Sequence, residues 1–232
     1  MIPAYNEERR IGPTIGRILE YLEAGGQSFE VLVVLDGTRD RTAEIVERMR
    51  TRGAPLTVLG HPINRGKGYC VRRGMLAARG DLRLFSDADL STPIEELGNL
   101  ATAIAAGYDI AIGSRRLSQS VVSQTRTRKV MGQVFNWFAQ RLVLPGIAYT
   151  QCGFKLFSAD AAERIFPRQL VDRFSFDVEL LYIAMRLGLR VAERPVVWNS
   201  DANSRVRPLS DGLRMAWDLL RIRRAERMGL YD

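Results

Sequence analysis

The sequence predicts an α/β fold, with a mostly parallel central sheet that helices cover on both faces. Short apolar, β-branched runs recur along the first half, and segments with helical spacing of apolar residues lie between them. Strands that alternate with helices in this way are typical of parallel sheets. A chain of 232 residues, 46% of them apolar, is also long enough to bury the core of one domain.

Several strands and helices are predicted in the first half. Residues 1–3 predict the last part of a first strand, and a helix follows with apolar residues at helical spacing from Ile11 to Leu22. The next strand, 30–35, is a continuous apolar run, which indicates burial on both faces. Asp40 is expected to cap the helix after it. The remaining predictions are strands 56–59, 82–86 and 108–113, a helix near 70–78, and a helix that Thr92-Pro93-Ile94-Glu95 opens as a capping box.

The second half is less regular but continues the same domain. Short strands are predicted at 154–157 and 190–198, around a helix at 177–187. Helices are also predicted at 126–144 and 209–228, and both carry basic residues beside apolar ones. Since no repeat or linker interrupts the sequence, residues 1–232 are expected to form a single domain.

Composition and charge restrict the classes of function. Lys and Arg number 34 against 26 Asp and Glu, and the net charge of +8 favours anionic partners such as phosphates, nucleic acid or an acidic membrane surface. Two cysteines exclude a disulfide framework, and a single histidine excludes a multi-histidine metal site. No apolar run is long enough to span a bilayer, and the first residues do not resemble a signal peptide. A cytoplasmic protein is therefore expected.

Acidic side chains follow two of the predicted strands. Asp87 and Asp89 come directly after strand 82–86, and ligands of parallel sheets bind beyond the carboxyl ends of the strands. Carboxylate oxygens at that edge can hold Mg²⁺ or Mn²⁺ together with substrate phosphates. Asp36 follows strand 30–35, where it either shapes the turn or accepts a hydrogen bond from a base or ribose. A parallel sheet would bring these carboxylates and the loop 3–7 to one edge.

A glycine-rich turn, Asn64-Arg65-Gly66-Lys67-Gly68, opens a predicted helix. Its backbone amides could approach an anion, and Lys67 would add positive charge. The spacing does not match a Walker A loop, and Val71 stands where a dinucleotide fingerprint has its third glycine. The turn therefore either binds an anion or only begins the helix.

Eight motifs, in order along nearly the whole chain, resemble those of the inverting family 2 glycosyltransferases, which have the GT-A nucleotide-diphospho-sugar transferase fold. The likeness is greatest to the polyprenyl-phosphate sugar transferases, the branch of the dolichyl-phosphate β-glucosyltransferases and mannose synthases. The motifs are Pro3-Ala4-Tyr5-Asn6-Glu7, Asp36-Gly37-Thr38, 64–68, Asp87-Ala88-Asp89, Gly113-Ser114-Arg115, 151–157, 176–180 and Ser204-Arg205-Val206.

The resemblance implies a donor half, 1–115, and an acceptor half, 116–232. It implies that Asp87, Asp89 and Ser91 hold Mg²⁺ or Mn²⁺ on the diphosphate of the donor. The expected catalytic residues are Asp89, Arg115, Arg128 and Arg205. The implied nucleotide-sugar contacts are Pro3, Ala4, Tyr5, Glu7, Asp36, Lys67, Asp87 and Ala88, and the implied acceptor contacts are Ser114, Arg115, Arg128 and Arg205.

The reaction that the resemblance implies is metal-dependent, inverting transfer of a hexose from a nucleotide-diphospho-sugar to a polyprenyl or dolichyl phosphate. UDP-glucose is the first expected donor and GDP-mannose the second. A phosphate acceptor is already ionised and needs no general base, which agrees with the single histidine. The basic faces of 126–141 and 214–227 would hold the protein on the cytoplasmic face of an anionic membrane. Nucleic acid is not an expected partner.

Three alternatives stay open. Transfer to a glycan hydroxyl would need a carboxylate base, for which Asp177 and Glu179 are the candidates. An inactive sugar-nucleotide-binding homologue is the second alternative, because Leu35 stands where the family commonly has an aspartate and because the predicted first strand is short. Tyr149 also stands where an acidic residue is common in the family. A nucleic-acid-binding module would explain the charge, but it gives no reason for two aspartates after strand 82–86.

Overall fold

The computed structural model describes residues 1–115, 117, 119–123, 140–141, 143–144, 147, 149–199 and 208–232 of the chain. Three parallel strands form the first part of the sheet in the order β1-β2-β3, and β2 is almost completely buried. Their bounds are β1 (Ile2–Ala4), β2 (Val31–Asp36) and β3 (Leu56–His61). The burial of β2 on both faces explains its continuous apolar sequence.

Four further strands continue the layer in the order β4-β7-β5-β8. They are β4 (Leu82–Ser86), β5 (Ile110–Ser114), β7 (Phe154–Ser158) and β8 (Val191–Pro195). β5 and β8 are parallel, whereas β7 is antiparallel to both of its neighbours. The two groups of strands meet at β1 and β4, where the backbone N–H of Ser86 donates to the carbonyl of Met1 at 3.1 Å.

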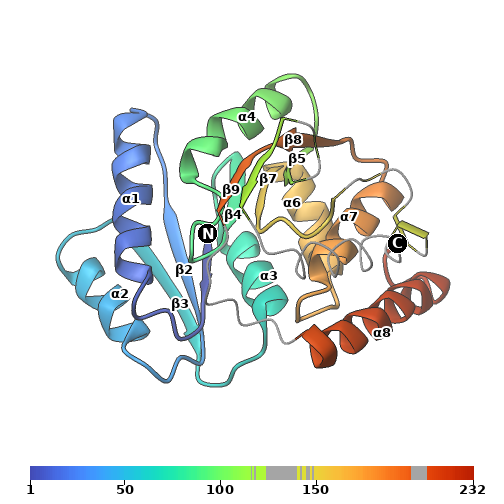
Figure 1. Cartoon of the computed structure of the whole chain (residues 1–232), viewed down its shortest axis with the longest axis horizontal. Coiled ribbons are helices and arrows are strands. Elements are labelled where there is room, and N and C mark those ends of the chain that lie inside the picture. Colours follow the sequence, from blue (N-terminus) through green and yellow to red (C-terminus); the bar gives the residue numbers. More distant parts are fainter. Residues whose placement is uncertain are drawn as a thin grey trace.

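Helices cover both faces of this layer. α1 (Ile11–Ala24) and α2 (Thr42–Thr51) lie on one side of β1–β3, and α3 (Lys67–Ala77) lies on the other side (Figure 1). One buried cluster joins α1 and α2 to α4 (Leu97–Ala105), and a second joins α3 to the helices of the C-terminal half. Those helices are α6 (Ala159–Ile165), α7 (Phe176–Arg186) and α8 (Pro208–Arg227). The structure therefore has the helix–sheet–helix layers that the sequence predicts.

The predicted capping box at 92–95 is wrong. The helix begins with the 3₁₀ turn η1 (Ile94–Glu96), whose start has no side-chain cap. The hydroxyl of Thr92 lies 3.7 Å from the sulfur of Cys152, and Glu95 pairs with Arg17 of α1. Both side chains have tertiary partners, and these partners replace the reciprocal bonds of a capping box.

The predicted strand 190–198 is two strands. β8 ends at Pro195, and β9 (Val197–Asn199) pairs with β6 (Val121–Ser123), which the sequence analysis does not predict. β8 pairs with β5 and β9 pairs with β6, so the predicted single strand is divided between two sheets. The predicted helix 126–144 falls mainly outside the described residues. No helix in the described part of the chain has the length and hydropathy that crossing a bilayer requires.

Candidate active site

The loops after β1 and β2 meet at the carboxyl edge of the sheet. The backbone N–H of Glu7 donates to the hydroxyl of Thr42 at 2.6 Å, and the N–H of Arg39 donates to the side chain of Asn6 at 2.8 Å. Asn6 has a left-handed backbone with φ of 51°, a conformation that asparagine tolerates better than most residues. The predicted nucleotide-contact loop 3–7 is therefore bound to the loop that follows Asp36.

Asp36 holds the glycine-rich turn in place. Its carboxylate is buried and accepts hydrogen bonds from the Asn64 side chain at 2.9 Å, from Arg65 N–H at 2.7 Å and from Gly66 N–H at 3.0 Å. Gly66 has φ of +115°, and a Cβ there would lie 2.5 Å from the carbonyl oxygen of Asp172. Only glycine fits this turn without strain. Asp36 is thus a positioning residue for the turn 64–66, whereas the sequence predicts for it only a role in its own turn or a contact with a base or ribose.

Lys67 connects that turn to the aspartate pair. Its ammonium lies 2.6 Å from Asp87 Oδ1, and both side chains are partly exposed. Burial lowers the pKa of Lys67, but the nearby carboxylates of Asp87 and Asp177 outweigh it and raise the pKa above its ordinary value. The lysine therefore stays charged beside the predicted metal ligands.

Asp87 and Asp89 lie together after β4 and keep their carboxylates partly exposed. Burial, followed by the negative charge of Asp87, raises the pKa of Asp89 above its ordinary value. Ser91 opposes this shift, because its backbone N–H donates to Asp89 at 2.9 Å and its hydroxyl also bonds the carboxylate. Two repelling carboxylates with only oxygen donors are a set that fits Mg²⁺ or Mn²⁺.

Gly153, at the entry to β7, packs directly against Asp87. Its carbonyl accepts the backbone N–H of Asp87 at 3.1 Å, and a Cβ on this glycine would lie 2.0 Å from Asp87 Oδ2. Gly153 lies in the motif 151–157 but is not among the predicted site residues. The only sequence signal is a glycine directly before an apolar strand, which is too common to indicate such a contact.

A buried ion pair lies next to this glycine. Lys155 is completely buried, forms an ion pair with Asp177 and donates to the carbonyl of Cys152 at 2.5 Å. Its ammonium also lies 5.2 Å from the centre of the Phe85 ring. Asp177 therefore neutralises an interior cation, and this engagement argues against its use as a general base.

Glu179 does not belong to the site. Its side chain is fully buried and accepts hydrogen bonds from the backbone of Leu170 and Val171 and from the hydroxyl of Tyr231, at 2.7 to 3.1 Å. Burial raises the pKa of this carboxyl above its ordinary value. Glu179 holds the C-terminal segment on α7, so neither candidate base for a glycan hydroxyl is freely presented to solvent.

Arg115 lies against two aromatic rings at the end of β5. The guanidinium carbon is 4.5 Å from the centre of the Tyr149 ring and 4.2 Å from that of Trp198. Burial lowers the pKa of Arg115 below its ordinary value. Arg115 Nε, Ser114 Oγ and Thr150 Oγ1 are buried and have no hydrogen-bond partner among the described residues. A cation held by stacking with unsatisfied polar atoms nearby is suited to an anionic ligand.

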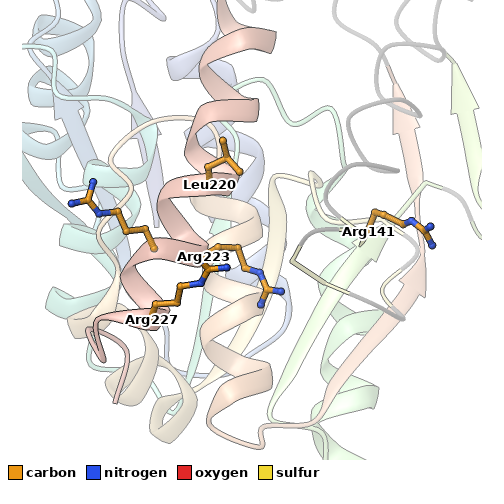
Figure 2. Close-up of a pocket in the computed structure, with 5 residues that line it drawn as sticks. Arg141, Leu220, Arg223 and Arg227 are labelled. Carbon is orange, nitrogen blue, oxygen red and sulfur yellow. The ribbon is translucent and has the colours of Figure 1, made fainter.

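Two of the predicted acceptor residues, Arg128 and Arg205, lie outside the described residues. A different group of arginines surrounds a cavity of about 380 Å³ on α8 (Figure 2). Figure 2 shows the α8 side chains gathered on one helix, with Arg141 coming from a separate segment. The lining residues are Arg141, Leu220, Arg223, Arg224 and Arg227.

Comparison with known proteins gives consistent matches. The family model "Glycosyl transferase family 2" matches residues 1–166. A dolichyl-phosphate β-glucosyltransferase of Trichomonas vaginalis is 39% identical over 243 residues, which cover 100% of this chain and 72% of the relative. The dolichyl-phosphate β-glucosyltransferase of Homo sapiens is 34% identical over 238 residues, which cover 96% of this chain and 74% of the relative.

Solved structures share the architecture. The glucosyl-3-phosphoglycerate synthase of Mycobacterium tuberculosis, in complex with Mn²⁺, UDP and phosphoglyceric acid, superposes with a TM-score of 0.65 at 20% identity, and covers 95% of this chain and 75% of that one. The mannosyl-3-phosphoglycerate synthase of Rubrobacter xylanophilus gives a TM-score of 0.68 at 21% identity, and the match covers 98% of this chain and 73% of that one. These matches confirm the fold that the sequence predicts.

Proposed function

The chain belongs to glycosyl transferase family 2, and on that premise we propose that this glycosyltransferase transfers glucose from UDP-glucose to a dolichyl or related polyprenyl phosphate, with inversion. The observation that carries the proposal is the pair Asp87 and Asp89 beside Lys67, in a chain that is 39% identical to a dolichyl-phosphate β-glucosyltransferase. GDP-mannose is the second donor to test. In this proposal residues 1–115 chiefly serve the donor, and residues 116–232 chiefly serve the acceptor.

The donor side would use Asp87 and Asp89 to hold Mg²⁺ or Mn²⁺, with Ser91 supporting Asp89 through its two hydrogen bonds. Such an ion supplies positive charge to a departing diphosphate. Lys67 contributes a second cation at the same place. The loop 3–7 would contact the nucleotide, while Asp36 acts through the turn that it holds.

The acceptor side would use Arg115, because an ionised phosphate that approaches an anionic donor must be held by fixed positive charge. The rings of Tyr149 and Trp198 contact the guanidinium, and its Nε has no hydrogen-bond partner among the described residues. Since the acceptor oxygen is already deprotonated, no base is required. This agrees with the engagement of Asp177 and Glu179 inside the protein.

Asp89→Asn is expected to lower transfer from UDP-glucose to a short polyprenyl phosphate by about a hundredfold or more, because one carboxylate of the metal pair is lost. The measurement is the initial rate of lipid-linked product with Mn²⁺ or Mg²⁺, and EDTA should stop the wild-type reaction. Asp81→Asn, at an exposed aspartate before β4, is the matched control and should keep wild-type activity.

Several results would overturn parts of this proposal. Equal rates for wild type and Asp89→Asn would remove the metal role of that residue. Product formed only from GDP-mannose would change the donor, and product formed only on a glycan alcohol would change the acceptor. UDP-glucose binding without product on any acceptor would indicate an inactive homologue.

Arg115→Lys is expected to raise the KM for the lipid phosphate by about tenfold with a smaller change in the KM for UDP-glucose. A lysine keeps the charge but loses the planar group that lies against two rings and bonds a phosphate through two nitrogens. Steady-state kinetics with each substrate varied in turn would measure this. Arg17→Lys, on α1 in an exposed pair with Glu95, is the control. An unchanged KM for the lipid phosphate would contradict the role of Arg115.

We also propose that α8 rests on an anionic membrane. Its inner face buries Leu219 and Ile222, whereas large apolar side chains on the outer face stay 53 to 63% exposed. The exposed members of that outer face, at spacings of three and four residues, are Trp217, Leu220, Arg221 and Arg224, and the exposed Met228 lies in the turn that follows the helix. Aromatic and apolar residues beside arginines on one helix face are typical of interfacial helices. A lipid-linked acceptor is reached most directly from such a position.

Arg221→Glu with Arg224→Glu is expected to weaken binding to vesicles that contain phosphatidylserine by at least tenfold. Each basic residue near an anionic surface contributes about 1 kcal/mol, and reversal adds repulsion. Vesicle cosedimentation at low and high salt would measure the effect. The same change in net charge at the exposed Arg48 of α2 and the exposed Arg52 directly after it, Arg48→Glu with Arg52→Glu, should leave binding nearly unchanged. Equal weakening by both pairs would contradict a role specific to α8.

A further inference from the structure

Three side chains of different chemistry meet where β2 and β3 end and α3 begins. Asp36 and His61 are partners in the parallel register, and Cys70 faces them from the start of α3. His61 Nε2 lies 3.5 Å from Asp36 Oδ1 and 3.8 Å from Cys70 Sγ, and the three ligand atoms lie within 4.8 Å of one another. Neighbouring ligands around tetrahedral Zn²⁺ are roughly 3.3 to 3.8 Å apart, given bonds of about 2.0 Å to nitrogen or oxygen and 2.3 Å to sulfur.

The orientation of His61 suits a ligand. Its Nδ1 lies 2.6 Å from the carbonyl oxygen of Ile63, and since a carbonyl can only accept, Nδ1 carries a hydrogen. The neutral ring then has its lone pair on Nε2, the atom that faces Asp36 and Cys70. Metal-bound histidines have the same arrangement, in which the other ring nitrogen donates to a carbonyl or carboxylate.

The other two ligand atoms are also held in place. Cys70 is completely buried, and Asp36 is oriented by the hydrogen bonds that it accepts from the turn 64–66. The Tyr69 ring contacts the His61 ring edge-on at 4.9 Å between centres. The three ligands therefore converge without rearrangement of the backbone, which is the property of a preformed site.

We propose that Asp36, His61 and Cys70 form a second metal site, which takes a thiophilic divalent cation of the zinc type. Binding makes bonds from the cation to a carboxylate oxygen, to Nε2 and to Sγ, while the thiol proton leaves to solvent. Sulfur and imidazole ligands select zinc over magnesium, whereas the Asp87 and Asp89 pair provides only oxygen. The two sites would therefore take different ions.

The position of the site determines what the cation does. Its ligands come from β2, β3 and α3, three elements that the sheet ladder, side-chain packing and hydrogen bonds such as that from Arg73 to the carbonyl of Gly60 also join. Asp36 also holds the turn that carries Lys67, and Lys67 contacts Asp87. Zinc at this point would stabilise the donor half of the fold and fix the turn beside the Asp87 and Asp89 pair.

The test is a titration of the metal-free full chain with Co²⁺ as a spectroscopic substitute for Zn²⁺. One equivalent should produce the thiolate-to-cobalt charge-transfer absorption in the near ultraviolet, and Zn²⁺ should displace it. Cys70→Ser should abolish this absorption, while Cys152→Ser, at the other buried cysteine, should retain it. His61→Gln should raise the Co²⁺ concentration needed for this absorption at least tenfold, and Asp81→Asn, at an exposed position, should leave it unchanged.

A second measurement covers the case in which Cys70→Ser folds poorly. Zn²⁺ should raise the melting temperature of the wild type and of Asp89→Asn, but not that of His61→Gln, because a ligand that binds only the folded state stabilises it. The absence of this charge-transfer absorption in the wild type would overturn the proposal. Its persistence in Cys70→Ser would also overturn it. Either result would leave Asp36, His61 and Cys70 as a cluster of side chains that binds no metal. These measurements do not depend on glucosyl transfer.

Discussion

Gly153→Ala is expected to lower the transfer rate by about a hundredfold or more, although the position lies outside the aspartate pair. The added Cβ would lie 2.0 Å from Asp87 Oδ2 and 2.4 Å from Asp87 Cγ, so the carboxylate has to leave its position. Displacement of a group in the reaction centre by about 1 Å can reduce a rate by a factor of 10². The measurement is kcat/KM for UDP-glucose at saturating Mn²⁺, with the affinity for Mn²⁺ determined in parallel.

Gly16→Ala is the matched control for this substitution. Gly16 is exposed on α1, and a Cβ there meets no atom within 4 Å. Alanine in place of glycine inside a helix stabilises it by up to about 1 kcal/mol, so this variant should be active and slightly more stable. A folded Gly153→Ala protein with wild-type kcat/KM would contradict the importance of the contact with Asp87.

Lys155→Met is expected to lower the free energy of unfolding by about 3 to 5 kcal/mol. The substitution removes the cation from a fully buried ion pair and leaves the carboxylate of Asp177 unpaired in the interior. It also removes the bond to the carbonyl of Cys152, next to Gly153. Equilibrium unfolding in urea, followed by circular dichroism, would measure the loss.

A double substitution separates the charge from the packing. Lys155→Met combined with Asp177→Leu should recover most of the lost stability, because no charge is then left unpaired. Arg17→Met, in the exposed pair with Glu95, should change stability by at most about 1 kcal/mol. If Lys155→Met unfolds at the same urea concentration as the wild type, the buried pair does not stabilise the fold.

The sequence alone determined the layers of the fold and the position of the aspartate pair. The apolar run at 30–35 predicts a strand buried on both faces, and β2 (Val31–Asp36) is such a strand. Asp87 and Asp89 follow β4 as predicted, because the end of a strand in the chain is also an edge of the sheet. These features depend on local hydrophobic patterns, which a sequence displays directly.

Only the tertiary structure decided which distant residues meet in the site. Asp87 contacts Gly153 because β7 lies beside β4 in an antiparallel direction, and an apolar pattern of period two is the same for either direction. It contacts Lys67 because α3 begins at the same edge of the sheet. An acidic residue at the start of a helix likewise has the same sequence pattern whether it faces solvent or, like Asp177, a buried lysine. Pairing between segments far apart in the chain depends on how the layers pack, and the local sequence does not record it.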